Sequence, residues 1–187
     1  LCSSAGPSRY LTCTDYLASR EEFDLYKCPQ CGFLFTYDYP GEDEIYRYYD
    51  SSGYISHDDN AGGFVNLIYL RARNIMLGRK RRLVEKSTGI TGGSILDIGC
   101  GTGWFAGKMK KAGWKVTGIE PNAKAREFAS SYAGIDVLDP SGISRLPGTS
   151  FDCITLWHVL EHLHKPSDYA FEIKRLLKPG GICIAAL

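Results

Sequence analysis

The stretch ILDIGCGTG, residues 95–103, runs from an apolar strand directly into a loop with a glycine at every second position. A helix is expected to follow at once, from Trp104. Glycine tolerates positive φ angles and, lacking a Cβ, lets the backbone approach a ligand closely. In open α/β sheets such a loop lies beyond the carboxyl end of a strand, where ligands bind. The glycine pattern alone does not distinguish a ligand loop from a tight strand-to-helix turn, which also favours glycine.

Short strands and helices alternate from Ser94 to the end of the chain. This alternation predicts an α/β domain over residues 91–187, with a parallel sheet covered by helices on both faces. Right-handed crossovers make such a sheet doubly wound. The expected strands are 94–98, 115–119, 135–138, 152–156 and 182–186, and the expected helices are 104–112, 123–131 and, in its main part, 162–177.

A carboxylate stands at the end of the second expected strand. The run Val116-Thr117-Gly118-Ile119 ends in Glu120, about 20 residues after the glycine loop, where a carboxylate can accept hydrogen bonds from both hydroxyls of a ribose. Charge-assisted hydrogen bonds of this kind contribute roughly 1.5–3 kcal/mol each. The G-x-G-x-G spacing differs from the G-x-G-x-x-G of dinucleotide-binding folds. The alternative is a solvated acid at a strand end.

Four motifs in order resemble those of class I S-adenosylmethionine-dependent methyltransferases. LDIGCGTG is similar to the family's first motif and GIEPN to its second. FDCITLWHVLEHL is similar to the fourth strand with its following segment, and LLKPGG to the turn before the fifth strand. The resemblance covers about residues 90–187 and implies a Rossmann-like methyltransferase fold with strand order 3-2-1-4-5. The family normally adds an antiparallel hairpin after strand 5, and this sequence does not include one. We therefore expect a domain truncated after strand 5.

The resemblance also implies S-adenosylmethionine as cofactor and a set of residues that bind it. The glycine loop borders the methionine end of the cofactor, and Asp97 helps to fix that end. Glu120 holds the ribose, Pro121 and Asn122 lie near the adenine, and the segment 141–143 faces the adenine. The expected cofactor-binding residues are Asp97, Gly99, Cys100, Gly101, Thr102, Gly103, Glu120, Pro121, Asn122, Ile143, Trp157 and His158.

His158 has two interpretations. Together with Glu161 and His162 it forms an H-x-x-E-H pattern that also occurs in zinc peptidases. That pattern needs a helix through His158 and a third ligand, whereas His158 follows directly on an apolar strand. Within the methyltransferase resemblance, its imidazole is a candidate catalytic base, because a side chain with a pKa near 6.5 accepts protons at neutral pH. The alternative is a packing role with one hydrogen bond, since methyl transfer needs little beyond in-line positioning.

The front of the chain carries a zinc-knuckle sequence, CPQCG at residues 28–32. Its two-residue gap lets the thiolates of Cys28 and Cys31 bind one ion, and a structural zinc takes four ligands. Cys2 is the third candidate, with a partner expected before Leu1; Cys13 fits less well because it lies in a strand-like run. The alternative is a pair of reduced thiols in a small β-rich cap. A zinc-ribbon-like segment (1–40), a helical connecting segment (41–90) and the α/β domain together resemble a bacterial group that includes sugar C-methyltransferases.

Composition narrows the function classes. The net charge of +1 argues against a dedicated nucleic-acid binder, and no apolar run is long enough for a membrane span. Seven cysteines without a secretory-type leader indicate reduced thiols or metal ligands, and hence the cytoplasm. A helix expected from Phe64 to Lys86 carries a basic run, which is either a solvated face, a contact for an anionic substrate or a contact for RNA.

The sequence therefore predicts methyl transfer to a small molecule, a sugar or another anionic metabolite. An RNA methyltransferase is the second hypothesis, and a binding module that keeps the cofactor fold without catalysis is the third. Neither the acceptor nor the oligomeric state follows from the sequence.

Overall fold

A computed structural model of the chain describes residues 6–16, 19–41, 44 and 64–187, with side chains from residue 68 in the last range. Cys2 and residues 42–43 and 45–63 of the expected connecting segment (41–90) lie outside the described residues. Tertiary contacts divide the chain into two units, Leu1–Gly62 and Gly63–Leu187, and each unit is described by itself.

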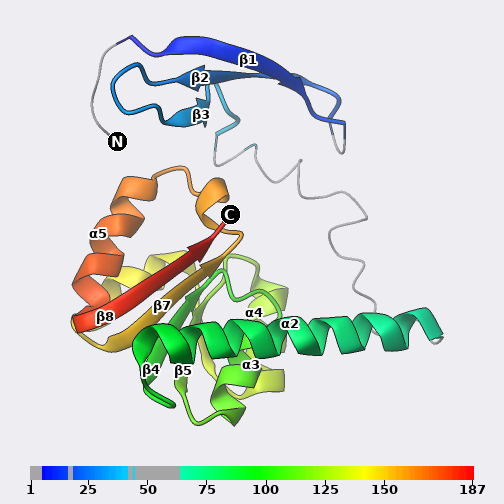
Figure 1. The fold of residues 1–187 in the computed structure, drawn as a ribbon, viewed down its shortest axis with the longest axis vertical. Coiled ribbons are helices and arrows are strands. Elements are labelled where there is room, and N and C mark those ends of the chain that lie inside the picture. The colour runs from blue at the N-terminus through cyan, green and yellow to red at the C-terminus, as the bar shows by residue number, and fades with distance from the viewer. Residues whose placement is uncertain (1–5, 17–18, 42–43, 45–63) are drawn as a thin grey trace. The chain divides into compact units, whose positions relative to one another are not determined.

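The first unit contains a small antiparallel sheet (Figure 1). Its strands are β1 (Ser8–Thr14), β2 (Glu22–Lys27) and β3 (Leu34–Thr36), in the order β1-β2-β3. The knuckle sequence forms the turn between β2 and β3. This arrangement confirms the β-rich cysteine-bearing segment that the sequence predicted.

The second unit contains a five-stranded parallel sheet, which confirms the predicted fold class. Its order is β6-β5-β4-β7-β8, which is the predicted 3-2-1-4-5 order. The strands are β4 (Ser94–Ile98), β5 (Lys115–Ile119), β6 (Asp136–Leu138), β7 (Phe151–Trp157) and β8 (Leu177–Ala186). β8 is longer than expected because it begins in the LLKPGG segment.

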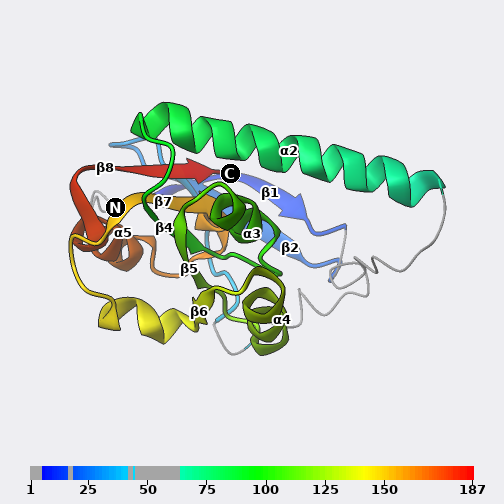
Figure 2. The ribbon, with the colours of Figure 1, turned by 90° about the horizontal axis from the view of Figure 1, so that it is seen from below.

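Helices connect the strands. They are α2 (Phe64–Thr88), α3 (Trp104–Lys111), α4 (Ala123–Ala133) and α5 (Pro166–Leu176), with short 3-10 turns η1 (Pro140–Arg145) and η2 (Leu160–His162). α5 starts later than expected because Pro166, which lacks a backbone N–H, occupies its first turn. α2 packs against α3 and the sheet, and its first turns extend beyond the sheet (Figure 2). None of the helices that the structure describes is both long and apolar enough to cross a membrane.

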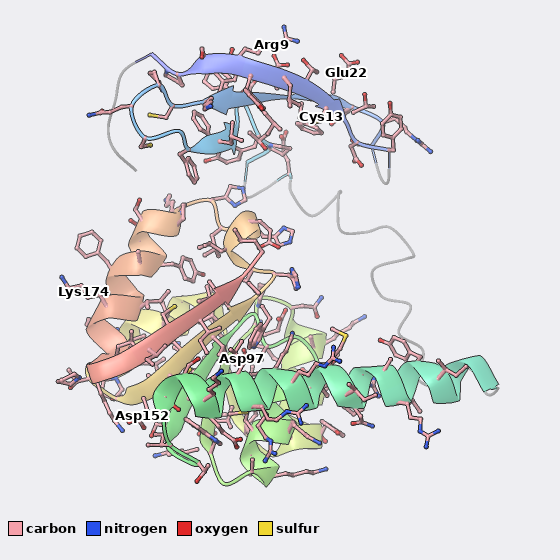
Figure 3. The ribbon with its side chains drawn as sticks, in the orientation of Figure 1. Arg9, Cys13, Glu22, Asp97, Asp152 and Lys174 are labelled. Carbon is pink, nitrogen blue, oxygen red and sulfur yellow. The ribbon has the colours of Figure 1, made fainter. Side chains whose placement is uncertain are left out.

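The central strand separates two apolar cores. Ile95 joins residues of α2 and α3 on one face, and Leu96 joins residues of η1, β7 and α5 on the other. Every residue of β4 after Ser94 is buried, as expected for a central parallel strand covered on both faces. At the start of the sheet, Asp152 accepts hydrogen bonds from the backbone N–H of Ser94 (2.8 Å) and from Lys178 Nζ (2.8 Å), joining three strands (Figure 3).

Candidate functional site

The glycine loop follows β4 and turns on left-handed backbone conformations. Gly99, Gly101 and Gly103 have φ angles of 72°, 53° and 79°. A Cβ on Gly99 would lie 2.3 Å from Val159 Cγ2, and one on Gly103 would lie 2.8 Å from Ala129 Cβ. Packing within the protein accounts for both of these glycines. A Cβ on Gly101 would meet no described atom within 4 Å, so this glycine is the place where a ligand can lie against the backbone.

Glu120 fastens the loop to the end of β5. Its side chain is buried, with Oε2 accepting a hydrogen bond from the backbone N–H of Gly101 (2.9 Å) and Oε1 one from Asn122 (3.0 Å). An ionised carboxylate has about four acceptor positions, so both oxygens keep capacity for a ligand's hydroxyl groups. The expected acid therefore lies next to the open glycine, at the edge where the sequence placed it.

Two residues near Glu120 stabilise the turn between β5 and α4. Asn122 caps α4, because its side chain accepts a hydrogen bond from the backbone N–H of Ala125 (3.1 Å). Arg126, which the sequence did not single out, donates from Nη1 to the carbonyl oxygens of Glu120 (2.8 Å) and Pro121 (2.6 Å). The sequence could have indicated this role of Arg126, because it lies about one turn into the helix that follows the acidic motif.

Asp97 is a buried acid at the end of the central strand, next to α2 (Figure 3). Thr155 of β7, its partner in the strand register, donates a hydrogen bond from Oγ1 to Asp97 Oδ1 at 2.7 Å. Burial raises the pKa of Asp97 to about 7, although the Thr155 hydrogen bond and the charge of Lys80 act in the opposite direction. The site thus holds a carboxyl group that titrates near neutrality.

Lys80 of α2 and Trp157 of β7 are in contact near Asp97. The Lys80 ammonium of α2 lies 4.4 Å from the centroid of the Trp157 ring, and Trp157 packs edge-on against Phe105 at 5.5 Å. Burial lowers the pKa of Lys80, while the charge of Asp97 raises it. The sequence predicted Trp157 but not Lys80 or Thr155 as site residues.

His158 follows Trp157 with a left-handed backbone, φ 58°. Such a conformation costs about 1–3 kcal/mol in a residue other than glycine. It exposes the imidazole, whose side chain is 64% accessible and whose Nδ1 lies 3.7 Å from Glu161 Oε1. No helix passes through His158, and no group of three metal-ligating side chains occurs among the described residues. The peptidase interpretation therefore lacks the helix that it requires.

The remaining predicted residues lie around this edge in different roles. Cys100 is buried and packs toward Gly118, where a Cβ would approach its Sγ to 2.7 Å; burial raises the pKa of its thiol. Thr102 and Pro121 are exposed. Ile143 lies on η1 and is buried in the core beside β5 and β6.

The cysteine knuckle of the first unit forms a tight turn. The backbone N–H of Cys28 donates to Phe33 O (2.9 Å), that of Gly32 donates to Cys28 O (3.0 Å), and Gly32 has φ 72°. Cys28 is buried and Cys31 is exposed. The described residues thus supply two thiols in a knuckle-like turn, while the third candidate, Cys2, lies outside them.

The second unit is similar to known proteins. Residues 69–186 match the profile of a family described as a methyltransferase domain. The mitochondrial ubiquinone biosynthesis O-methyltransferase of Schizosaccharomyces pombe is 33% identical over 99 residues, covering 49% of this chain and 36% of the relative. A tRNA U34 carboxymethyltransferase of Cellvibrio japonicus is 37% identical over 97 residues, covering 46% of this chain and 30% of the relative.

A solved structure gives the same result at the level of the fold. The structure of the [4+2]-cyclase SpnF matches this chain with a TM-score of 0.51 and 30% sequence identity. The match covers 57% of this chain and 43% of the SpnF chain. The chain spans about a third of the length of the two curated relatives.

The buried carboxyl predicts a pH dependence of stability. Asp97 keeps its proton to about pH 7 in the folded protein, against an ordinary value of 3.8. The folded state therefore binds more protons between these values, and the free energy of unfolding contributed by Asp97 falls as pH rises from about 4 to about 7, by on the order of 4 kcal/mol. Asp97→Asn, which still accepts the Thr155 hydrogen bond, is expected to lose this fall.

Urea unfolding of both proteins at about pH 5 and about pH 7.5 measures the difference. Asp168→Asn, at an exposed position in the first turn of α5, is the matched control. An identical pH dependence in wild type and Asp97→Asn would contradict the raised pKa.

Proposed function

Because this chain belongs to the methyltransferase-domain family, we propose that it binds S-adenosylmethionine and transfers its methyl group to an acceptor. The observation that carries the proposal is the buried carboxylate of Glu120, bonded to the backbone of Gly101 beside the open space over that glycine. A ribose lying there finds an acceptor for its hydroxyls and a backbone free of Cβ atoms. Asp97, at the same edge, provides a buried carboxyl group for the methionine end.

The cofactor supplies the chemistry, an electrophilic methyl group on a sulfonium. This chain's residues hold and orient the reactants, and fixed in-line geometry can supply several kcal/mol of the barrier reduction. Cys100, Thr102 and Gly103 contribute backbone at the turn, and Trp157 stands at the carboxyl end of β7. In this proposal the residues of the second unit position the reactants and form no covalent bond with them.

His158 is the residue we assign as base. Its imidazole projects from the end of β7 toward solvent, and Glu161 lies 3.7 Å from Nδ1. At this position the imidazole can take a proton from an acceptor hydroxyl or amine. The strained backbone at this residue supports a functional role, since such conformations cluster at active sites.

The acceptor we propose is a small molecule, a sugar or another anionic metabolite. Exposed cations of α2, among them Arg79, Arg82 and Lys86, lie on the helix that borders the site and suit an anionic substrate. The similarity to a tRNA U34 carboxymethyltransferase supports RNA as the second candidate. The third candidate is a binding module that keeps the cofactor fold without catalysis, because a fold does not determine a function.

For the first unit we propose a structural zinc held by Cys28 and Cys31 together with Cys2 and one further ligand. The knuckle turn and the buried Cys28 support two positions of a tetrahedral site. The proposed membership of the group that includes sugar C-methyltransferases rests on the resemblance of the zinc-ribbon-like segment, the connecting segment and the α/β domain taken together. A cytoplasmic location stays a prediction from the cysteine content.

Removing the Glu120 carboxylate tests the cofactor site. Glu120→Ala is expected to weaken binding of S-adenosylmethionine and S-adenosylhomocysteine more than tenfold, or about 1.4 kcal/mol, because the ribose loses its acceptor. Isothermal titration calorimetry measures both affinities. Glu127→Ala, an exposed acid on α4, is the matched control and should bind like wild type.

Because Glu120 also holds Gly101 and Asn122, a Glu120→Gln variant separates lost charge from a disturbed loop. Equal affinity in wild type and Glu120→Ala, or a folded wild type that binds neither ligand, would contradict the proposed site.

Transfer of a labelled methyl group from S-adenosylmethionine to a cell extract identifies the acceptor class. We expect label in the small-molecule fraction; label in RNA that ribonuclease removes would establish the second candidate instead. His158→Ala is expected to lower kcat at least tenfold, with partial restoration by added imidazole, and His164→Ala serves as control. If the protein binds the cofactor but transfers no label to any fraction of the extract, the result would support the non-catalytic binding module.

The metal content of the purified protein tests the knuckle. Elemental analysis should find about one zinc per chain, lost in Cys28→Ser and Cys31→Ser and retained in Cys13→Ser, whose cysteine lies on β1. Wild type without zinc, both as purified and after zinc addition, would rule the metal site out.

A further inference from the structure

The stretch from α2 to α4 is the basic part of the second unit. Residues 68–133 contain 13 lysines and arginines against 4 acids, whereas residues 134–187 contain 5 against 6. Asp97 and Glu120 are buried, and Glu85 forms an ion pair. The fourth acid, on α4, is thus the one exposed acid in residues 68–133, a range that the structure describes throughout. The positive charge is therefore local, although the net charge of the whole chain is only +1.

Aromatic side chains and an arginine form a row across the same three helices. α2 packs against α3, and α3 packs against α4 (Figure 2). The Arg73 guanidinium of α2 lies 3.9 Å from the centroid of the Trp104 ring of α3 and 5.6 Å from that of Tyr69. The Trp104 ring lies 4.2 Å from that of Tyr132 on α4, and Tyr132 stacks on Phe128 with 5.8 Å between centroids. These five residues are called the aromatic row below.

Most rings of the aromatic row are open to solvent. Tyr69, Phe128 and Tyr132 are 40%, 46% and 44% exposed. A hollow of about 350 Å³ lies beside Tyr132, and Lys110 and Lys111 are among the residues that line it. Flat exposed rings and cations therefore lie next to one another on one surface of the second unit.

An unpaired RNA strand matches both properties of this surface. Its bases stack on aromatic side chains whatever their sequence, and its phosphates pair with lysine and arginine. The guanidinium of Arg73 suits either contact, because it is planar and always charged. A duplex hides the faces of its bases and can use the positive charge alone. RNA is the polynucleotide that commonly presents unpaired bases, in its loops, bulges and ends.

We propose that the aromatic row and the lysines beside it bind single-stranded RNA. Bases stack on Phe128 and Tyr132, and phosphates contact Arg73 and Lys111. The surface belongs to α2, α3 and α4 and does not include the acids or the histidine of the proposed methyl-transfer site. RNA binding here therefore requires neither bound cofactor nor any particular methyl acceptor.

Fluorescence anisotropy with a labelled RNA of alternating A and C, about 12 nucleotides long, tests the surface. The whole chain without cofactor is expected to bind this strand about tenfold more tightly than a duplex of the same length, because only the strand offers base faces. The double variant Phe128→Leu, Tyr132→Leu keeps apolar side chains without aromatic faces. It should lose about tenfold or more in affinity for the strand and keep its affinity for inorganic polyphosphate, which has no bases.

Two variants serve as controls. Phe171→Leu removes a ring that is 77% exposed on α5, which packs on the other core, and should bind RNA like wild type. The exchange Phe128→Tyr, Tyr132→Phe keeps both aromatic faces and should retain binding. Urea unfolding monitors the folding of each variant, and a poorly folded leucine double variant is replaced by Phe128→Leu alone.

Three outcomes would overturn the RNA surface. They are equal losses for RNA and polyphosphate in the leucine variants, duplex binding as tight as that of the strand, and tighter binding of the matching DNA strand. A wild type that binds no RNA would also overturn it and would leave a protein partner as the occupant. Affinity for S-adenosylhomocysteine should be unchanged in the leucine variants, so a failure here leaves the proposed function intact. Conversely, a wild type that binds RNA but not S-adenosylhomocysteine would overturn the proposed function alone.

Discussion

A buried carboxyl at the end of the central strand is the constraint on which the second unit depends. Burying an acid is unfavourable unless partners are supplied, and Asp97 is 2% exposed. Thr155 supplies a hydroxyl from the neighbouring strand, and Lys80 supplies a positive charge from α2. Three segments far apart in the sequence are thereby committed to one another, and the helix that precedes the sheet becomes part of the site.

The glycine loop is shaped before any ligand arrives. Val159 and Ala129 fill the spaces beside Gly99 and Gly103, and Glu120 holds the backbone of Gly101. A loop restrained on both sides loses little conformational freedom on binding, which favours affinity. The open side of Gly101 is thus a preformed surface, while Glu120 serves both the loop and, in our proposal, the ribose.

Much of this architecture could be predicted from the sequence. Alternating apolar runs and helices gave the strand segments, and the motifs gave the order 3-2-1-4-5. Thr155 could not be predicted, because it lies inside an apolar run and its partner, 58 residues earlier, is set only by the pairing of β4 with β7. Lys80 was hidden among the cations of α2. That helix leaves apolar residues such as Ile68 and Ile75 exposed, so its periodicity does not reveal its inner face.

The contact between Val159 and Gly99 has an evolutionary consequence. A Cβ at position 99 would lie 2.3 Å from the valine Cγ2, so the two positions share one small volume although they belong to different motifs. A smaller residue at 159 would remove the clash, but the φ of 72° would still disfavour any side chain at 99. Substitutions at position 159 are therefore limited to residues that still fill this volume. Position 99 must remain glycine. In descendants of this chain the first motif should stay constant here while the segment after β7 varies within a narrow range of sizes.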